Sequence, residues 1–326
     1  MIRSRLTGTG AYLPEHRLTN HDLERMVETS DRWIVERTGI RERRIAAAEE
    51  ATSDLAVAAG RQALAASGVA ASAVELIIVA TATPDMLFPS TACLVQERLG
   101  AKQAFAFDLS AACTGFLYAL AVADQYIRAG TYRTVLVIGA EVLSRMIDWT
   151  DRTTCILFGD GAGAVVVQAD RGARGVLSSH LHSDGSLWDL IHIPGGGSRR
   201  PPSTETLTER MNFVKMKGSE TFRVAVRTLE EVAREALAAN NLSPEQLSWI
   251  IPHQANLRIL QAVAERLSVP EEKVVINVDR YGNTSAASIP IALDEMVRAG
   301  RVRPDDLLLL EAFGAGLTWG ASVVRW

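Results

Sequence analysis

The stretch Phe105-Ala106-Phe107-Asp108-Leu109-Ser110-Ala111-Ala112-Cys113-Thr114-Gly115-Phe116-Leu117 begins as a short apolar strand, turns through small residues and enters a helix. The helix expected over 116–127 is apolar on nearly every side, and a helix without a polar face is normally buried. Cys113 lies at its start, where unpaired N–H groups and the helix dipole favour a thiolate. The stretch therefore predicts a buried helix with a candidate nucleophile at its N-terminus. A cysteine that only fills space is the alternative.

The composition is that of a globular chain with room for a large core. The chain has 326 residues, of which 48% are hydrophobic and 22% are charged, and disordered chains are less apolar than this. A net charge of −4 gives no global reason to expect nucleic acid or an anionic membrane as a partner. We therefore expect neither, and an acidic partner would have to bind a local basic patch.

The cysteine pattern and the N-terminus indicate the compartment. Cys93, Cys113 and Cys155 are too few for a disulfide framework, and no C-x-x-C pair suggests a metal site. Residues 1–6 lack the apolar core of a signal peptide. No uninterrupted apolar run reaches the roughly 18 residues that span a bilayer. We expect a cytoplasmic protein that binds no metal.

Apolar periodicity predicts strands alternating with helices along the whole chain. Besides the opening stretch, strands are expected at 2–12, 74–81, 134–140 and 162–168, and helices at 21–28, 31–38, 52–67 and 91–99. The glycine-, proline- and arginine-rich segment 184–208 is expected to be a long surface loop. From 218 to 326 we expect the order helix, strand, helix, strand, helix, strand, strand. This alternation indicates mostly parallel sheets covered by helices.

A weak internal repeat divides the chain in two. Ala63–Ser67 resembles Ala236–Asn240 at an offset of 173, and Cys113 falls on Asn283 at an offset of 170. The repeat predicts two similar βα halves, residues 1–172 and 173–326. Because sites in such sheets lie at the carboxyl ends of strands, Cys113 and its counterpart should converge near a pseudo-twofold axis.

Cys113, His253 and Asn283 each follow an expected strand and could share one pocket. Alone, the histidine could be structural and the asparagine a turn residue. Together they suit one chemistry: a thiolate attacks a thioester, and neutral His and Asn donors stabilise the enolate oxygen formed when a malonyl thioester loses CO2. The glycine-rich turn at 313–316 could bring a second N–H to the acyl carbonyl beside the N–H of Cys113.

Longer motifs surround these residues: Ala111–Phe116, Pro252–Asn256, Gly282–Ala286, Glu311–Gly320, Asp151–Gly163 and Trp33–Ile40. Together they resemble the β-ketoacyl-acyl-carrier-protein synthase III family of the thiolase superfamily, over essentially the whole chain. The resemblance implies an α/β, thiolase-like five-layered αβαβα fold made of two similar halves, and a homodimer. It implies the initiating step of type II fatty acid synthesis, in which acetyl-CoA or another short acyl-CoA condenses with malonyl-acyl carrier protein to give a 3-oxoacyl-acyl carrier protein.

The resemblance also assigns roles. Cys113 would be the nucleophile, His253 and Asn283 would serve decarboxylation, and the N–H groups of Cys113 and Ala315 would form the acyl oxyanion hole. The coenzyme A site would comprise Trp33, Arg37, Arg152, Gly218, Phe222 and Asn256, with the adenine between Trp33 and Arg152. The carrier-protein contact would comprise Gln254, Ala255, Asn256, Leu257 and Arg258. No cofactor is implied, since acyl-CoA and malonyl-acyl carrier protein are substrates.

Two further features concern partners. Carrier proteins are acidic, so a basic patch is expected, with Arg258 and Arg266 on one helix and Arg223 and Arg227 on another. Phe88 matches a loop that crosses a dimer to close the partner's acyl pocket.

Other hypotheses stay open. A secondary-metabolite acyltransferase on the same fold would carry the same trio, and a cysteine hydrolase would present Cys, His and Asn in the same order. An inactive structural protein is a third hypothesis, against which the intact trio argues. Thiolases have a second cysteine and elongating synthases a second histidine where Asn283 stands. The sequence does not define the acyl primer or the pathway of the product.

Overall fold

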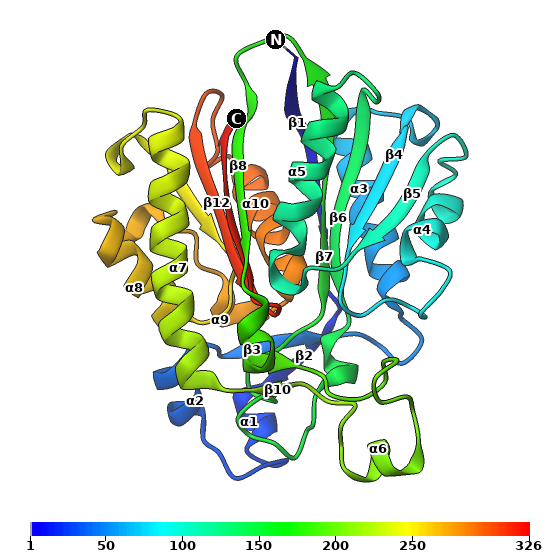
Figure 1. The fold of residues 1–326 in the computed structure, drawn as a ribbon, viewed down its shortest axis with the longest axis vertical. Coiled ribbons are helices and arrows are strands. Elements are labelled where there is room, and N and C mark those ends of the chain that lie inside the picture. The colour runs from blue at the N-terminus through cyan, green and yellow to red at the C-terminus, as the bar shows by residue number, and fades with distance from the viewer. Residues whose placement is uncertain (1) are drawn as a thin grey trace.

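The computed structural model describes residues 2–326, which form two large sheets with helices between and outside them, and two small two-stranded sheets (Figure 1). The first sheet has the strand order β1 (Arg3–Tyr12), β7 (Gly161–Asp170), β6 (Thr134–Glu141), β4 (Leu76–Ala80) and β5 (Phe105–Leu109). The second has the order β11 (Trp249–Pro252), β12 (Leu307–Gly314), β13 (Thr318–Arg325) and β8 (Gly175–Ser183). The expected boundary near residue 172 falls between β7 and β8.

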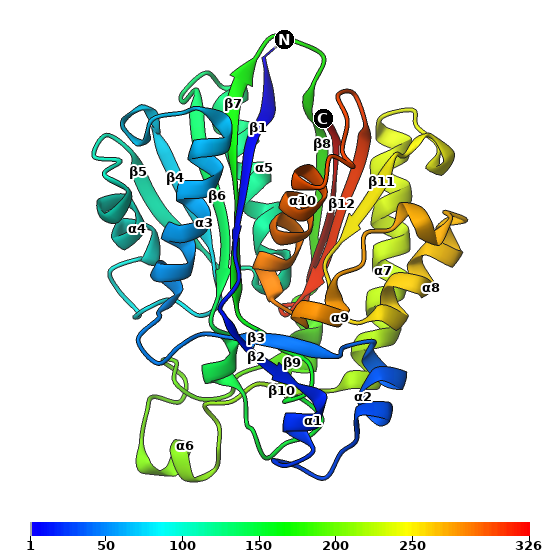
Figure 2. The same cartoon turned by 180° about the vertical axis from the view of Figure 1, so that it is seen from behind.

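Helices form three further layers. The helices α5 (Gly115–Arg128) and α10 (Ser288–Arg298) lie between the sheets, and one apolar cluster joins them to both. The outer face of the first sheet is covered by α3 (Thr52–Ser67) and α4 (Thr91–Leu99), and that of the second by α7 (Gly218–Ala239) and α8 (Leu257–Leu267) (Figure 2). The expected αβαβα layering is therefore confirmed.

The apolar sequence of α5 explains its central place. Phe116, Leu117 and Leu120 are fully buried in the cluster between the sheets, and each such side chain contributes about 1.5–3 kcal/mol when it leaves water. One side of the helix is less enclosed, since Val122 is half-buried and Gln125 is exposed. The helix α5 is therefore buried on the face that packs between the sheets, but not on nearly every side as predicted.

Smaller elements gather at one end of the layers, below the sheets in Figure 1. They are β2 (His16–Thr19), β3 (Glu42–Ile45), β9 (Ile191–His192), β10 (Lys215–Met216), α1 (Asn20–Leu23), α2 (Asp31–Thr38), α6 (Thr204–Thr208) and α9 (Val278–Tyr281). The segment 184–208 is therefore not only a surface loop, because it contains β9 and α6. The helix expected over 21–28 is shorter, since α1 ends at Leu23.

Two expectations about the sheets were wrong. Both sheets are mixed: β4 pairs in parallel with β5 and β6, but β7 runs antiparallel to β6 and β1. The strand expected between α8 and α10 is reduced to a single bridge between Ile250 and Val274. There the side chain of Gln254 takes the place of a neighbouring strand, since it accepts from the N–H groups of Asn277 and Val278 and donates to the carbonyl of Val275.

The two central helices begin alike. Each follows a single 3-10 turn, η2 (Ala112–Thr114) or η7 (Ser285–Ala287), whose first residue has a positive φ of 45° or 48°. This match makes Ala286 the counterpart of Cys113, so the predicted pairing with Asn283 was three residues off. The cause is that α10 has 11 residues and α5 has 14, which changes the offset from 173 to 170 along the helices.

No helix within residues 2–326 is long and apolar enough to cross a membrane.

Candidate active site

A cavity of about 960 Å³ opens where the two halves meet. Its lining includes Cys113, His253 and Asn283 together with Ala315. Cys113 lies in η2 after β5, His253 follows the last residue of β11, and Asn283 lies between α9 and η7. The structure thus brings the predicted trio together, with Cys113 and His253 after the carboxyl ends of strands, where open α/β sheets place their sites, and Asn283 after the helix α9.

The backbone around Cys113 requires small residues. A Cβ on Gly314 would lie 2.8 Å from the Cys113 nitrogen and 3.1 Å from its Cβ, so only glycine lets the end of β12 come so close. Thr318 secures this approach, since its hydroxyl donates to the carbonyl of Ala111 at 3.3 Å. The Cys113 N–H and the turn that carries Ala315 are therefore neighbours at the cavity wall.

The resting Cys113 side chain is a thiol. Burial, against a lowering contribution from Ser285 and with a smaller raising contribution from the negative charge of Glu141, raises the pKa of the thiol to about 12. The prediction of a thiolate was therefore wrong for the resting protein, because desolvation and a nearby carboxylate outweigh the position at the start of the helix.

His253 is held as a neutral donor. Its Nδ1 lies 2.7 Å from the Ser288 hydroxyl oxygen, which also accepts the Gln254 N–H at 3.3 Å. Ser288 can donate to Nδ1 while its oxygen accepts from Gln254, and in that arrangement the ring proton of His253 is on Nε2. Burial lowers the pKa of His253 to about 3, so the imidazole is uncharged at neutral pH.

Asn283 is positioned by its backbone and by its own side chain. Its N–H donates to Leu157 at 2.8 Å, and its carbonyl accepts from Gly159 at 3.0 Å. Its Oδ1 accepts the Ser285 N–H at 2.8 Å, which leaves the amide NH2 as the free donor. Two uncharged donors, one from His253 and one from Asn283, therefore face the cavity that Cys113 enters.

The cavity mouth is aromatic and basic. Trp33 and Arg37 line it one helical turn apart on α2, and the Arg37 guanidinium lies 4.4 Å from the Trp33 ring centre. Arg152 does not line the cavity, but its guanidinium lies 5.2 Å from the same ring and donates to the carbonyl of Glu28 at 2.9 Å. The predicted coenzyme A residues Gly218, Phe222 and Asn256 line the cavity as well.

The residues expected to meet a carrier protein divide into two groups. Ala255, Asn256 and Arg258 line the cavity, and Leu257 is half-buried beside them. Gln254 is only 1% exposed and bonds to buried backbone groups, so the prediction that it contacts a partner was wrong.

The basic patch also differs from the expected one. Arg223 and Arg258 line the cavity, whereas Arg266 pairs with Glu230 at 2.9 Å. Arg227 is exposed on α7 and is not part of the lining.

Phe88 lies outside the cavity of its own chain. It is 83% exposed, and the adjacent Leu87 is 86% exposed. Among residues 2–326, no cluster of three or more histidine, cysteine, aspartate or glutamate side chains could hold a metal ion.

The sequence did not predict a role for two residues near Cys113. Ser285 and Glu141 both influence the pKa of the thiol. Glu141 is the one charged residue at the end of the otherwise apolar run Val135–Ala140, directly after a predicted strand. A carboxylate at the carboxyl end of a buried strand was the available signal.

Known proteins resemble this chain along its whole length. A family model described as 3-oxoacyl-[acyl-carrier-protein] synthase III matches residues 107–185, and its C-terminal counterpart matches 237–326. The β-ketoacyl-[acyl-carrier-protein] synthase III of Rhodospirillum centenum is 58% identical over 100% of this chain and 99% of its own.

Solved structures agree. The 3-oxoacyl-[acyl-carrier-protein] synthase III of Aquifex aeolicus superposes with a TM-score of 0.93 at 50% identity, covering 99% of this chain and all of its own. The priming β-ketosynthase of the R1128 polyketide pathway superposes with a TM-score of 0.92 at 36% identity, covering 99% and 96%. The chain therefore belongs to the β-ketoacyl-[acyl-carrier-protein] synthase III family, the acyl-transferring condensing enzymes that initiate fatty acid synthesis.

Proposed function

We propose that the enzyme condenses acetyl-CoA, or another short acyl-CoA, with malonyl-acyl carrier protein and releases CO2. The observation that carries the proposal is the pair of neutral donors, His253 and Asn283, in the same cavity as the Cys113 thiol. An uncharged pair suits an oxygen that becomes negative during the reaction, since the donors need no proton transfer to stabilise it.

In the first half-reaction, the Cys113 sulfur attacks the acyl thioester and coenzyme A leaves. The negative oxygen of the tetrahedral intermediate would accept from the N–H groups of Cys113 and Ala315. The close approach of Gly314 to the Cys113 nitrogen supports this assignment. Two such donors are typically worth several kcal/mol in the transition state.

In the second half-reaction, the malonyl thioester loses CO2 and its enolate attacks the acyl group on Cys113. The Nε2–H of His253 and the amide of Asn283 would donate to the enolate oxygen. Because His253 stays neutral, the enolate keeps its electron pair for carbon–carbon bond formation and is not protonated.

The cavity mouth suits a nucleotide-bearing thioester. Trp33 would stack on the adenine, with Arg152 moving outward from its present 5.2 Å to cover the other face and Arg37 near the phosphates. Gly218, Phe222 and Asn256 would line the path of the pantetheine arm. Residues 255–258 and Arg223 would meet the acidic carrier protein at the same mouth. The reaction requires no further cofactor.

We propose that the enzyme acts in the cytoplasm as a homodimer. The exposed pair Leu87 and Phe88 supports this assembly, since large apolar side chains at such exposure mark an interaction surface. Phe88 would then close the acyl pocket of the partner copy and restrict the primer to short chains.

The test is intact-mass detection of acyl-enzyme across a panel of acyl-CoAs, followed by malonyl-acyl carrier protein or malonyl-CoA. The proposal predicts that short acyl groups load Cys113 and that only the carrier-bound malonate yields product. Hydrolysis of the acyl-enzyme without transfer would indicate a hydrolase instead, and failure of every acyl-CoA to load Cys113 would contradict the proposal.

A secondary-metabolite ketosynthase is the second candidate, because the R1128 priming synthase shares the fold at 36% identity. Preferential loading of primers longer than acetyl would favour it.

A further inference from the structure

The loop between β4 and α4 carries the exposed Phe88 between two well-anchored ends. Residues 86–89 at its tip are exposed, with Leu87 at 86% and Phe88 at 83%. Thr91, where α4 begins, is fully buried. An apolar tip gains no burial by projecting into water, so its shape depends on the contacts at its two ends.

Glu141, the last residue of β6, holds the start of the loop. This residue is fully buried, and its carboxyl group accepts from the Ala82 N–H at 3.1 Å and from the Thr83 hydroxyl at 2.6 Å. Ala82 and Thr83 line the cavity of their own chain. The first residues of the loop are therefore fixed relative to that cavity.

Asp85 ties the loop to α3 just before the exposed tip. Its Oδ1 accepts the Ser53 N–H at 2.9 Å, and its Oδ2 accepts the Ser53 hydroxyl at 2.7 Å, in the first turn of α3. Two bonds from one carboxylate to one residue fix its orientation as well as its position. The Asp85 N–H also donates to the Thr91 hydroxyl at 3.2 Å, and that hydroxyl donates back to Oδ1 at 3.3 Å. Residues 85 and 91 thus close the tip into a short loop with Phe88 near its middle.

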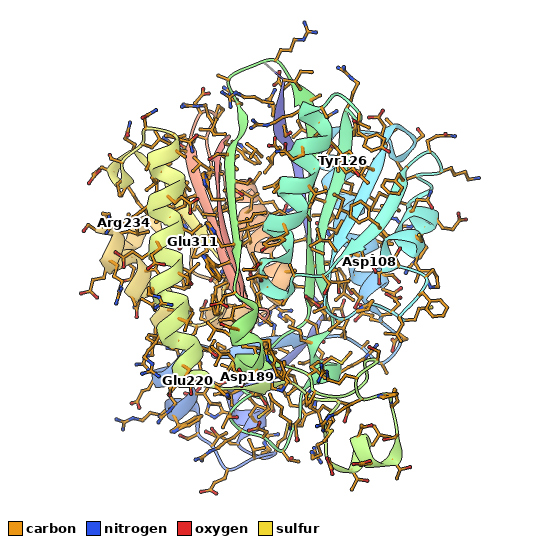
Figure 3. All side chains as sticks on the ribbon, in the orientation of Figure 1. Asp108, Tyr126, Asp189, Glu220, Arg234 and Glu311 are labelled. Atoms are coloured by element: carbon orange, nitrogen blue, oxygen red, sulfur yellow. The ribbon has the colours of Figure 1, made fainter. Side chains whose placement is uncertain are left out.

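Asp108 holds the far end of the loop. It lies near the end of β5 beside α4 (Figure 3), and its two oxygens accept the N–H groups of Thr91 and Ala92, each at 2.7 Å. The first N–H groups of a helix have no partner within the helix, and a carboxylate there also complements the helix dipole. The hydroxyl of Ser90, the N-cap residue, bonds to the Cys93 sulfur at 3.2 Å instead. Asp108 therefore caps α4 in its place and fixes where the exposed tip ends.

We propose that Asp85 and Asp108 are positioning residues for Phe88 and thereby limit the length of the acyl primer. The inference rests on the proposed function, in which Phe88 closes the acyl pocket of the partner copy. With both ends held, the tip keeps one shape before the two copies meet, so little conformational entropy is lost when Phe88 enters the pocket. A loop released at either carboxylate keeps its phenyl group but does not hold it in place, and a longer acyl chain then displaces it.

The test measures the rate constants with which acetyl-CoA and hexanoyl-CoA acylate Cys113, by rapid quench and intact mass. The diagnostic quantity is the ratio of the hexanoyl to the acetyl rate constant. Asp85→Ala and Asp108→Ala should each raise this ratio by about tenfold, because a well-formed apolar pocket discriminates by about that factor for a single methylene group. Phe88→Ala should raise it at least as much. Asp85→Asn should change it by less than about threefold, since the amide oxygen still accepts from Ser53.

Asp54→Ala is the matched control. Asp54 is the neighbour of Ser53 in the first turn of α3, but its carboxylate accepts from the Ala51 N–H at 2.7 Å and pairs with Arg98 of α4 at 2.7 Å. The control thus removes a carboxylate that joins the same two helices without holding the loop, and the ratio should stay unchanged. A merely structural role for Asp85 would slow both primers alike, which also leaves the ratio unchanged.

The outcomes separate the inference from the proposed function. A raised ratio in Phe88→Ala with an unchanged ratio in Asp85→Ala and Asp108→Ala would overturn the inference and leave the proposed function intact. A raised ratio in Asp54→Ala would overturn it too, because general loosening of α3 and α4 would then explain the effect. An unchanged ratio in Phe88→Ala would contradict the role proposed for Phe88 itself, and the inference with it.

Discussion

The two halves of the molecule build the same turn and use it differently. In the first half, the turn before α5 carries Cys113, and the end of β6 in the first sheet carries Glu141. In the second half, the equivalent turn before α10 carries Ala286 in place of the cysteine. There the functional groups stand on either side of the turn, as Asn283 before it and Ser288, which orients His253, after it. One half holds the nucleophile and the other holds the donors.

The two halves therefore share a backbone fold, but the residues at equivalent positions do not share a chemical role. The first half contains the Cys113 thiol that would take up the acyl group, and the second half contains neutral hydrogen-bond donors, His253 and Asn283. Acyl transfer should therefore depend chiefly on Cys113, and decarboxylation on His253 and Asn283.

The largest effect is expected for Cys113→Ala, which removes the one cysteine among the described residues that line the cavity. Acyl-enzyme should disappear from intact-mass spectra, and condensation should fall by at least about 10⁴-fold. Cys93→Ala is the matched control, since Cys93 is exposed and lies outside the cavity. Acylation of Cys113→Ala, or its loss in Cys93→Ala, would refute the assignment.

Asn283→Ala should separate the two half-reactions. Acylation from acetyl-CoA should persist, while condensation with malonyl-acyl carrier protein falls by about 10²–10³-fold, because one donor to the enolate oxygen is lost. Rapid-quench measurement of both steps checks this. An equal loss in acylation with an unchanged circular dichroism spectrum would show that the two halves do not divide the work in this way.

Much of this organisation could be predicted from the sequence, because it depends on local patterns. The apolar helix after Cys113 and the glycine-rich motifs indicate buried elements and close backbone approaches. Cys113 and His253 were found because each follows a strand, and Asn283 was found through the internal repeat at an offset of 170. Glu141 and Ser285 escaped because their importance comes from contacts between β6 and η7, which lie more than 140 residues apart in the chain. Gln254 was wrongly predicted to contact a carrier protein for the same reason, since a local sequence pattern does not show its hydrogen-bond partners at 275–278.

Both halves bury carboxyl groups, and Glu311 tests what such burial costs when an oxygen of the carboxyl group has no donor. Its Oε2 has no hydrogen-bond partner in the described chain, and burial raises its pKa to about 8. The raised pKa means that the folded protein keeps the proton while the unfolded chain loses it, so stability should be highest below about pH 4.5 for this group and fall up to about pH 8.

Glu311→Gln removes this titration, so the free energy of unfolding should decline less between pH 5 and pH 8 than in the unmodified enzyme. Urea denaturation at several pH values measures the difference, which should amount to a few kcal/mol. An identical decline in both proteins would show that Glu311 is hydrated or paired in solution.

The smallest effect is expected at the cavity mouth, where both halves meet solvent. Arg258 lines the mouth and stacks on Phe222 at 5.4 Å, so Arg258→Ala should raise the KM for malonyl-acyl carrier protein by about three- to tenfold with little change in kcat. The effect should shrink as salt is added, because exposed charges are screened. Arg227→Ala is the control, since Arg227 is exposed on α7 outside the lining. Equal KM values for the two variants at low salt would contradict this prediction. A carrier protein that binds at the mouth should depend on Arg258, which lines the cavity, more than on Arg227, which does not.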